Sequence, residues 1–282
     1  MTTRSERAMS FGLIAEDYDR LRPGPPDEAV DWLVPTGCGV AVDLGAGTGL
    51  LTRKLTSRAS HVIAVEPDDR MSAVLRARSP EVEVLKGTAE EIPLPDACAD
   101  GVFVSSAWHW MDPDRAVPEI CRVLRDGGRF GVVWAGRDRQ VEWLHELSGI
   151  TSGNGTGPDG TGSDSTGSDS TGSDSTGSDR VSSGHTPSGH STSLGGPHGA
   201  ALPPAWPFRQ VETGSFGFTR AMTVEAIVAL LATYSGLISA SLADRAAVLA
   251  RAVAALSQRF PGAQEIDVPM RASCWRADRV PR

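Results

Sequence analysis

Residues 40–50 read Val-Ala-Val-Asp-Leu-Gly-Ala-Gly-Thr-Gly-Leu, a short apolar run that ends in an aspartate and passes into three alternating glycines. The apolar run predicts a buried strand, and the residues from Leu50 onward predict a helix. Glycines at such a turn have no Cβ and can adopt positive φ, so a bound molecule can approach the backbone closely. This stretch therefore predicts a parallel α/β sheet with a nucleoside-binding turn after its first strand.

The glycines of this turn, at positions 45, 47 and 49, have the spacing G-x-G-x-G. The dinucleotide-binding pattern is G-x-G-x-x-G, and here Leu50 stands where its last glycine belongs. The spacing argues against NAD and FAD, so a nicotinamide dehydrogenase on the same kind of sheet is the weaker alternative. Glu66 follows the next apolar run and precedes a proline. A carboxylate at that strand end can accept hydrogen bonds from both hydroxyls of a ribose.

Short apolar runs alternate with segments of helical period along the rest of the chain, which is typical of βαβ units. We therefore predict an α/β fold, doubly wound, with a mostly parallel seven-stranded sheet, helices on both faces and one interruption. The predicted strands are residues 40–44, 61–65, 82–85, 101–105, 129–134, 208–218 and 265–275. The predicted helices are residues 50–58, 70–78, 113–124, 224–233 and 242–259, and Asp126-Gly127-Gly128 is predicted to end the third of them in a turn.

The composition changes abruptly at residues 151–204, where 13 of 54 residues are Gly, 13 are Ser and 8 are Thr. The pentad TGSDS repeats from Thr161 onward, and no aromatic residue interrupts it. Such a segment buries too little apolar surface to offset its ordering entropy, so we predict a disordered linker. The predicted organisation is a core with its N-terminal segment over 1–150, a low-complexity insert over 151–204, and a C-terminal completion with a substrate cap over 205–282.

The charge balance and the cysteines exclude several classes of function. The chain carries 27 basic against 35 acidic residues, a net charge of −8, so we expect no nucleic-acid partner. The four cysteines have no metal-clip spacing, so we predict no metal site and expect a reducing, cytoplasmic compartment. No apolar stretch is long enough to span a bilayer, so we expect no membrane association. A small molecule is the partner that fits best, and the oligomeric state stays open.

Five stretches carry a family resemblance, in order along the chain. They are FGLIAEDYDRLRPGPP at 11–26, DLGAGTG at 43–49, VIAVEP at 62–67, GTAEEIPLPDACAD at 87–100 and EICRVLRDGGRFGVVW at 119–134. Together they resemble the lid-like segment and the motifs of the class I S-adenosylmethionine-dependent methyltransferases, which have a Rossmann-like sheet. The resemblance is closest to the small-molecule group that includes ubiquinone-biosynthesis and trans-aconitate methyltransferases. Asp126 departs from the proline that is usual in the last motif, and aspartate also suits a turn.

The resemblance implies S-adenosylmethionine as the cofactor and direct in-line transfer of its methyl group to a small organic acceptor. It also implies that Glu66 binds the ribose and that Met71 packs on the adenine. Tyr18 and Arg22 are expected to close over the cofactor. The other implied cofactor-binding residues are Asp43, Gly45, Ala46, Gly47 and Gly49 around the methionine part, Thr88, Ala89 and Glu90 at the adenine edge, and Ser105 near the sulfonium.

The acceptor side is predicted at residues 105–110, Ser-Ser-Ala-Trp-His-Trp, because open α/β sheets place their crevice at the carboxyl ends of the strands. His109 is the candidate general base, needed if the acceptor must lose a proton. Trp108 and Trp110 are predicted to shape an apolar acceptor pocket together with His109, with core packing as the alternative for one tryptophan. The run differs from the Asn/Asp-Pro-Pro-Tyr/Phe of amino-group methyltransferases of DNA, which argues against methylation of nucleic-acid bases.

Two readings of function follow from these observations. The first is a methyltransferase that acts on oxygen, carbon or nitrogen of a small acceptor. The alternative is a non-catalytic S-adenosylmethionine-binding protein that acts as a regulator or partner, since cofactor motifs alone are compatible with both. Turnover of an acceptor distinguishes the two.

Overall fold

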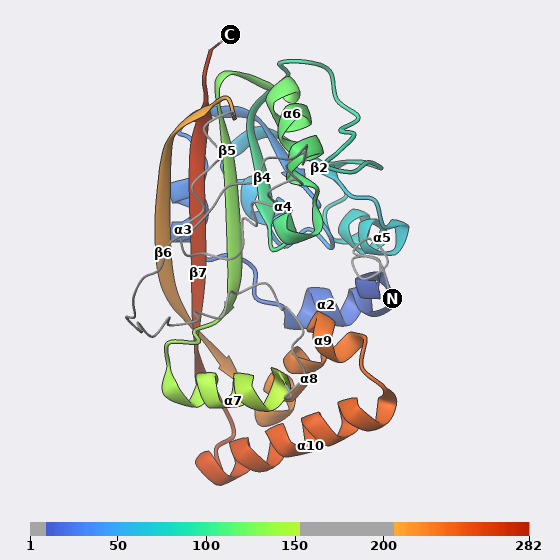
Figure 1. Ribbon diagram of the computed structural model, residues 1–282, viewed down its shortest axis with the longest axis vertical. Helices are drawn as coiled ribbons and strands as arrows, with labels where there is room; N and C mark the ends of the chain where they lie inside the picture. Colours follow the sequence, from blue (N-terminus) through green and yellow to red (C-terminus); the bar gives the residue numbers. More distant parts are fainter. Residues whose placement is uncertain (1–9, 153–205, 282) are drawn as a thin grey trace, which may run out of the picture.

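The computed structural model describes residues 10–152 and 206–281. Within these residues seven strands form one sheet in the order β3-β2-β1-β4-β5-β7-β6. Strand β7 is antiparallel to both of its neighbours, and the other neighbouring pairs are parallel. Helices cover both faces of the sheet (Figure 1). The predicted fold class, a doubly wound and mostly parallel seven-stranded α/β sheet, is confirmed.

The elements follow one another in the alternating order that the sequence predicted. The strands are β1 Cys38–Leu44, β2 Ala59–Val65, β3 Glu83–Leu85, β4 Ala99–Ser105, β5 Leu124–Arg137, β6 Phe208–Met222 and β7 Ile266–Arg279. The helices are η1 Ser10–Ile14, α2 Ala15–Leu21, α3 Asp27–Leu33, α4 Thr52–Leu55, α5 Asp69–Arg78, η2 Trp108–Trp110, α6 Pro113–Val123, α7 Glu142–Ser152, α8 Val224–Ala232, α9 Ser235–Ile238 and α10 Leu242–Arg259.

The central strands bury both of their faces, as continuous apolar runs predict. Successive side chains point to opposite sides, so Val102 packs in one core and Phe103 in the other. The first core lies between the sheet and α6, and Ile120 of that helix is fully buried in it. The second core lies under α3, α4 and α5, where Leu33 and Leu75 are fully buried. These two apolar cores fix the position of the parallel strands, whose carboxyl ends lie at one edge of the sheet.

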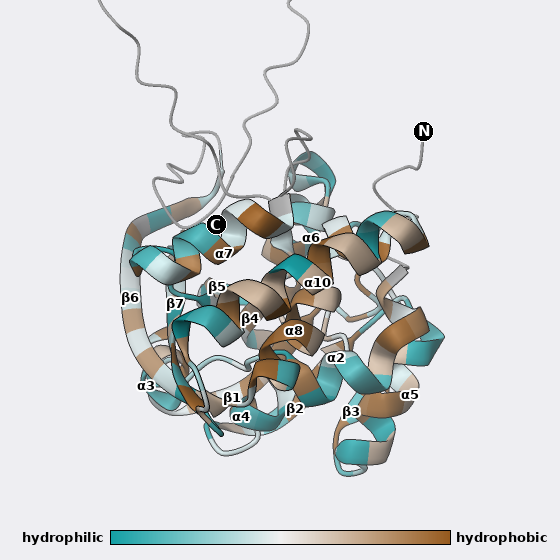
Figure 2. Cartoon of the chain, turned by 90° about the horizontal axis from the view of Figure 1, so that it is seen from below, coloured by the Kyte–Doolittle hydropathy of each residue, from teal (hydrophilic) through white to brown (hydrophobic). Residues whose placement is uncertain are grey.

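A third apolar cluster caps that edge. Helices α7, α8, α9 and α10 gather at the end of the sheet where β5 finishes (Figure 1). Seen from below, the apolar helix α8 lies between α10 and α2 (Figure 2). Ile227 and Leu230 of α8 are fully buried against Leu144 of α7 and Leu256 of α10. The C-terminal part of the chain therefore covers the edge of the sheet where the predicted site lies.

Several predicted boundaries differ from the structure. The helix predicted at 50–58 is the four-residue α4, because the glycine turn continues into it. The predicted Asp-Gly-Gly turn lies inside β5, where Gly127 has φ +75° beside a register shift. Strands β5, β6 and β7 continue past residues 134, 218 and 275 because they pair with one another over long antiparallel stretches.

Some elements were not predicted, and one prediction falls outside the described residues. Helices η1, α2, α3, α7 and α9 were not predicted. Residues 151 and 152, placed in the insert, continue α7, and the rest of the predicted linker lies outside the described residues. Among the helices that the structure describes, none has both the length and the apolar character required to cross a bilayer.

Candidate active site

The glycine turn joins the end of β1 to the end of β2. Gly45, Gly47 and Gly49 have φ of +68°, +58° and +86°, a region that favours glycine. The backbone N–H groups of Gly45 and Ala46 donate to the carbonyl of Val65, at 2.9 and 3.1 Å. A Cβ added to Gly47 would lie 3.4 Å from the Cε atom of Met71. The turn is thus held against the residue predicted to pack on the adenine.

Glu66 lies beside this turn and is 7% exposed. Its Oε2 accepts a hydrogen bond from the backbone N–H of Gly47, and its Oε1 accepts one from Asp68, both at 2.8 Å. Burial raises the pKa of Glu66, although the two backbone hydrogen bonds oppose the shift. A carboxylate has about four lone-pair sites, so Glu66 retains acceptor capacity for hydroxyl groups.

Asp43 is the penultimate residue of β1 and is completely buried. Its Oδ2 accepts a hydrogen bond from Thr52 Oγ1 at 2.6 Å, whereas its Oδ1 has no hydrogen-bond partner. Burial raises the pKa of Asp43 to about 7, and the nearby Glu66 adds to the increase. A buried carboxylate oxygen without a donor is uncommon and indicates a donor from a bound molecule. Two buried carboxylates beside a glycine turn fit a cofactor that carries ribose hydroxyls and an ammonium group.

The loop after β3 borders the same edge of the sheet. Ala89 is 4% exposed and packs in the core, whereas the Thr88 side chain is exposed. Glu90 is half-buried and accepts a hydrogen bond from the backbone N–H of Asp112 at 2.8 Å. Glu90 therefore ties this loop to the segment between η2 and α6.

The end of β4 carries the predicted acceptor residues. Ser105 is half-buried, and the next residue, Ser106, has φ +53°, which is uncommon for a residue other than glycine. Trp108 is 1% exposed and packs on the rings of Phe130 and Trp275, at 5.2 and 6.3 Å between centroids. The core-packing alternative therefore applies to Trp108.

Trp110 has different surroundings from Trp108. Its ring is half-buried and lies 4.5 Å from the His109 ring and 6.0 Å from Phe11 of the N-terminal segment. Phe11 in turn lies 5.7 Å from the ring of Tyr18. The structure thus brings the N-terminal segment next to Trp110, one of the predicted acceptor residues.

The N-terminal segment also reaches α8. The guanidinium of Arg22 donates to Thr233 Oγ1 at 3.0 Å and to the Thr233 carbonyl at 2.9 Å. The Cζ of Arg22 lies 4.1 Å from the ring centroid of Tyr234 and 5.3 Å from that of Tyr18. Burial raises the pKa of Tyr18, the charge of Arg22 opposes the shift, and the charge of Glu66 adds to it. Tyr18 is therefore within electrostatic range of the predicted ribose-binding carboxylate.

Sequence reasoning missed Thr233 and Arg137 as neighbours of this site, and it placed Tyr234 only within the predicted cap over the acceptor. Arg137 ends β5, and its Cζ lies 5.3 Å from the Tyr234 ring centroid. Both tyrosines of the chain, Tyr18 and Tyr234, lie beside Arg22, and this proximity has no signal in the local sequence.

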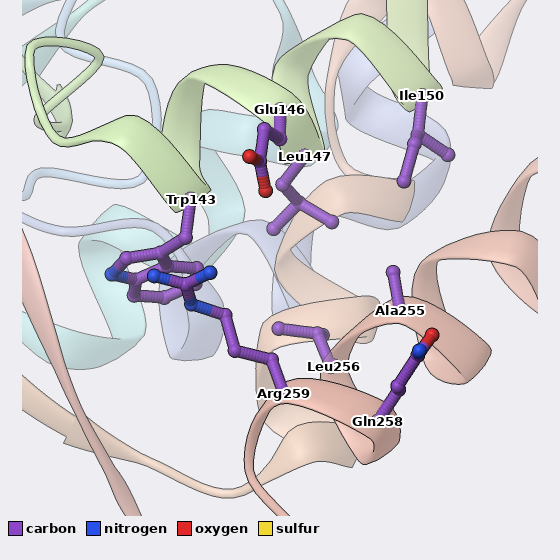
Figure 3. A pocket seen from close by; sticks show the side chains of 8 residues that line it. All are labelled: Trp143, Glu146, Leu147, Ile150, Ala255, Leu256, Gln258 and Arg259. Carbon is purple, nitrogen blue, oxygen red and sulfur yellow. The ribbon is translucent and has the colours of Figure 1, made fainter.

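A separate pocket lies between α7 and α10 (Figure 3). Its walls contain none of the residues that the sequence predicted for the cofactor or the acceptor. Its lining residues are Trp143, Glu146, Leu147, Ile150, Ala255, Leu256, Gln258 and Arg259. Across the described parts of the chain, no three His, Cys, Asp or Glu side chains are grouped so that they could hold a metal ion.

Known proteins resemble this chain over the same region. Residues 42–132 match a family model described as a methyltransferase domain. An uncharacterized methyltransferase of Mycobacterium bovis, Mb3374, is 50% identical over 153 residues, which cover 54% of this chain and 63% of that protein. A methyltransferase-like protein of Schizosaccharomyces pombe, C25B8.10, also uncharacterized, is 37% identical over 50% of this chain and 57% of its own length. The chain thus spans less than two thirds of the length of these relatives.

Two further similarities concern a shorter part of the chain and the fold. A malonyl-[acyl-carrier protein] O-methyltransferase of Methylococcus capsulatus is 37% identical over 95 residues, 32% of this chain and 34% of that protein. A solved chain from Anaeromyxobacter dehalogenans, described as a candidate type II methyltransferase, superposes with a TM-score of 0.64 and 23% identity. That superposition covers 93% of this chain and 99% of the other, and it supports the fold alone. The glycine turn, Asp43 and Glu66 all lie within the residues that match this methyltransferase domain.

Proposed function

We propose that this protein transfers a methyl group from S-adenosylmethionine to a small organic acceptor by direct in-line displacement. The observation that carries the proposal is the pair of buried carboxylates at the glycine turn, above all Asp43, whose Oδ1 lacks a donor. The family match over residues 42–132 covers both carboxylates and the turn between them. When bound, the cofactor supplies a methyl group that its sulfonium has already activated.

The residues around the turn would hold the cofactor. Glu66 would accept hydrogen bonds from the ribose, and the unsatisfied Oδ1 of Asp43 would accept one from a donor of the methionine part. Met71 lies against the turn and would pack on the adenine. The remaining cofactor contacts in the proposal come from Tyr18, Arg22, Gly45, Ala46, Gly47, Gly49, Thr88, Ala89, Glu90 and Ser105.

The acceptor would bind at the end of β4. Methyl transfer from a sulfonium mainly requires that the acceptor be held in line and that water be excluded. The rings of Trp110 and Phe11 provide an apolar wall there, and Tyr18 and Arg22 close the edge of the sheet against α8. His109 would take the proton of an acceptor that must lose one. We propose a small-molecule acceptor, which the sequence motifs implied; the relatives described above are uncharacterized methyltransferases and not specifically of the ubiquinone-biosynthesis or trans-aconitate type.

Thermal unfolding with S-adenosylhomocysteine and, separately, with NAD tests the cofactor. A ligand at a hundred times its Kd adds ~2.7 kcal/mol. For a protein of this size the midpoint should rise by roughly 5 to 11 °C. We expect this shift with S-adenosylhomocysteine alone. A shift with NAD alone, or no shift, would contradict the proposal.

A second measurement separates catalysis from binding. The protein is incubated with methyl-labelled S-adenosylmethionine and a fractionated pool of small metabolites, and labelled products are detected by mass spectrometry. We expect a labelled product that is absent from the Asp43→Asn variant. Cofactor binding without any labelled product would favour the non-catalytic alternative.

A further inference from the structure

Arg137, at the end of β5, is a buried cation. The contacts among the described residues leave its charge uncompensated. Its side chain is 8% exposed, and neither Nε nor Nη1 has a hydrogen-bond partner. The adjacent carboxylate, Asp138, is already engaged by Arg271, at 2.7 and 3.0 Å, and by the backbone N–H of Gln140. Burying a charge without a partner is strongly unfavourable, so Arg137 favours the binding of an anion, which the described residues do not supply.

Its surroundings add further positive charge. Two guanidiniums lie close to the Tyr234 ring, with Arg137 Cζ at 5.3 Å and Arg22 Cζ at 4.1 Å from its centroid. Burial would raise the pKa of Tyr234, but the charges of Arg137 and Arg22, a hydrogen bond from Arg137 and the charge of Arg139 together lower it. The Tyr234 hydroxyl is therefore in a strongly positive environment that favours a negative group.

A series of aromatic and cation–π contacts links this cluster to the proposed acceptor site. A continuous series of contacts leads from Trp110 to Phe11 at 6.0 Å, from Phe11 to Tyr18 at 5.7 Å, and from Tyr18 to Arg22 at 5.3 Å. The series ends at Tyr234, which precedes α9, and at Arg137, which ends β5. The end near Trp110 is aromatic, and the end near Arg137 is cationic.

We propose that Arg137 and Tyr234 bind a carboxylate of the methyl acceptor. The proposal rests on the proposed function and deepens it by naming the substrate class, a small organic acid with an apolar body. A planar guanidinium with unused N–H donors and a neighbouring phenol suit a carboxylate, and the aromatic residues suit the body of such an acid. The methionine part of the cofactor also carries a carboxylate, and Arg22 already stands in the segment expected to close over the cofactor.

Binding measurements on the full chain, saturated with S-adenosylhomocysteine, test the proposal. The probes are acetate, hexanoate, benzoate, phenylacetate and glutarate, each paired with its neutral amide, and inorganic phosphate. We expect at least one carboxylate to bind the wild type at least tenfold more tightly than its amide does. Binding of phosphate alone, or of no carboxylate, overturns the proposal.

Two variants assign the binding to this cluster. Arg137→Gln should weaken the binding of that carboxylate at least tenfold, and Tyr234→Phe, which keeps the ring, should weaken it by a smaller factor. Arg115→Gln, an exposed arginine on α6, is the matched control and should leave the binding unchanged. Since Arg137→Gln removes an unpaired buried charge, the variant should also unfold at a higher temperature than the wild type without ligand. An unchanged carboxylate affinity in Arg137→Gln overturns the assignment.

A comparison of two cofactor analogues shows whether Arg137 binds the carboxylate of the acceptor or that of the cofactor. S-adenosylhomocysteine is compared with 5′-methylthioadenosine, which lacks the amino-acid part. If Arg137 serves the acceptor, Arg137→Gln should change both affinities less than twofold. A tenfold loss confined to S-adenosylhomocysteine would assign Arg137 to the cofactor and overturn the proposal. A wild type that binds neither compound would instead refute the proposed function itself.

Discussion

At the scale of single residues, the buried carboxylate of Asp43 destabilises the ligand-free protein, although it is proposed to bind the cofactor. Its pKa in the folded protein, about 7, lies above the ordinary value of 3.8. The folded state therefore binds more protons than the unfolded state between these two values, and stability falls as the pH rises through this range. Above about pH 7 the whole penalty is present.

We therefore predict that Asp43→Asn stabilises the ligand-free protein at pH 8 by about 2 to 4 kcal/mol and has little effect at pH 4. The same variant should bind S-adenosylhomocysteine at least tenfold more weakly, because it loses a buried charged acceptor. Urea unfolding at both pH values and a binding titration measure the two effects. Asp267→Asn, at an exposed position of β7, is the control. A destabilised Asp43→Asn protein at pH 8 would contradict this account of Asp43.

The affinity of a Glu66 variant for the cofactor product tests the ribose contact. Glu66→Gln keeps an oxygen that can accept the N–H of Gly47 or Asp68, so the fold should persist. The loss of charge-assisted hydrogen bonds to the ribose should raise the Kd for S-adenosylhomocysteine by about 10 to 100-fold. Isothermal titration measures the change, with the exposed Glu265→Gln as the control.

An analogue makes this test specific to the ribose. Wild-type protein should discriminate 5′-methylthioadenosine from its 2′-deoxy form, and Glu66→Gln should discriminate less. Equal discrimination by the two proteins would mean that Glu66 does not contact the ribose.

At the scale of elements, the strand-turn-helix unit depends on Gly49. This residue has φ +86°, and a Cβ there would lie 2.9 Å from Cγ of Leu75 on α5. Gly37 is the matched control, since its φ is +76° and a Cβ there would meet nothing within 4 Å. Gly37→Ala should cost about 1 to 2 kcal/mol of stability from the backbone alone. Gly49→Ala should cost about 1 to 3 kcal/mol more, because the core must also shift. Equal costs in urea unfolding would show that the turn does not pack tightly on α5.

The same unit shows what the sequence could predict. Strands β1 to β4 are short apolar runs bounded by turn residues, so local pattern alone locates them. The carboxylates at their ends were predicted for the same reason, because parallel strands bring their carboxyl ends together. Local pattern did not locate α2, whose seven residues include four charged ones and show no apolar period.

Long-range pairing explains the functional residues that the sequence did not reveal. Residues 135–140, Ala-Gly-Arg-Asp-Arg-Gln, read as a polar loop, yet β5 continues through Arg137 because that residue pairs with Met270 of β7. Arg22 and Thr233 are separated by 211 positions in the chain. Neither the pairing of Arg137 nor the contact of Arg22 with Thr233 can be predicted from the local sequence. The cationic end of the proposed site was therefore found only in the folded structure.

At the scale of the whole molecule, both described parts of the chain contribute residues to the proposed site. Strands β6 and β7 complete the sheet beyond β5, and Thr233 and Tyr234, which follow α8, contact Arg22 of the N-terminal segment. Truncation after residue 152 would therefore expose the edge of β5 and remove one side of the site. Excision of the low-complexity segment alone leaves these contacts in place.

We predict that replacing residues 153–204 with a Gly/Ser linker of about 15 residues preserves both folding and cofactor binding. The cut leaves α7 whole to Ser152 and keeps Trp206, whose carbonyl accepts the N–H of Phe208 at the start of β6. Because no contact of the sheet, the cap or the site described above involves a residue of the excised segment, urea unfolding should remain cooperative. The Kd for S-adenosylhomocysteine should change less than twofold.

A chain with residues 153–204 in scrambled order is the matched control, since it keeps length and composition and changes only the sequence. If the segment acts as a spacer, the scrambled and the excised proteins should both match the wild type. A loss of binding in both variants would show that the order of its residues matters to the site. A loss in the excised protein alone would show that the length of the segment matters. The segment connects the end of α7 to β6 at the far edge of the sheet, and β7 pairs between β6 and β5.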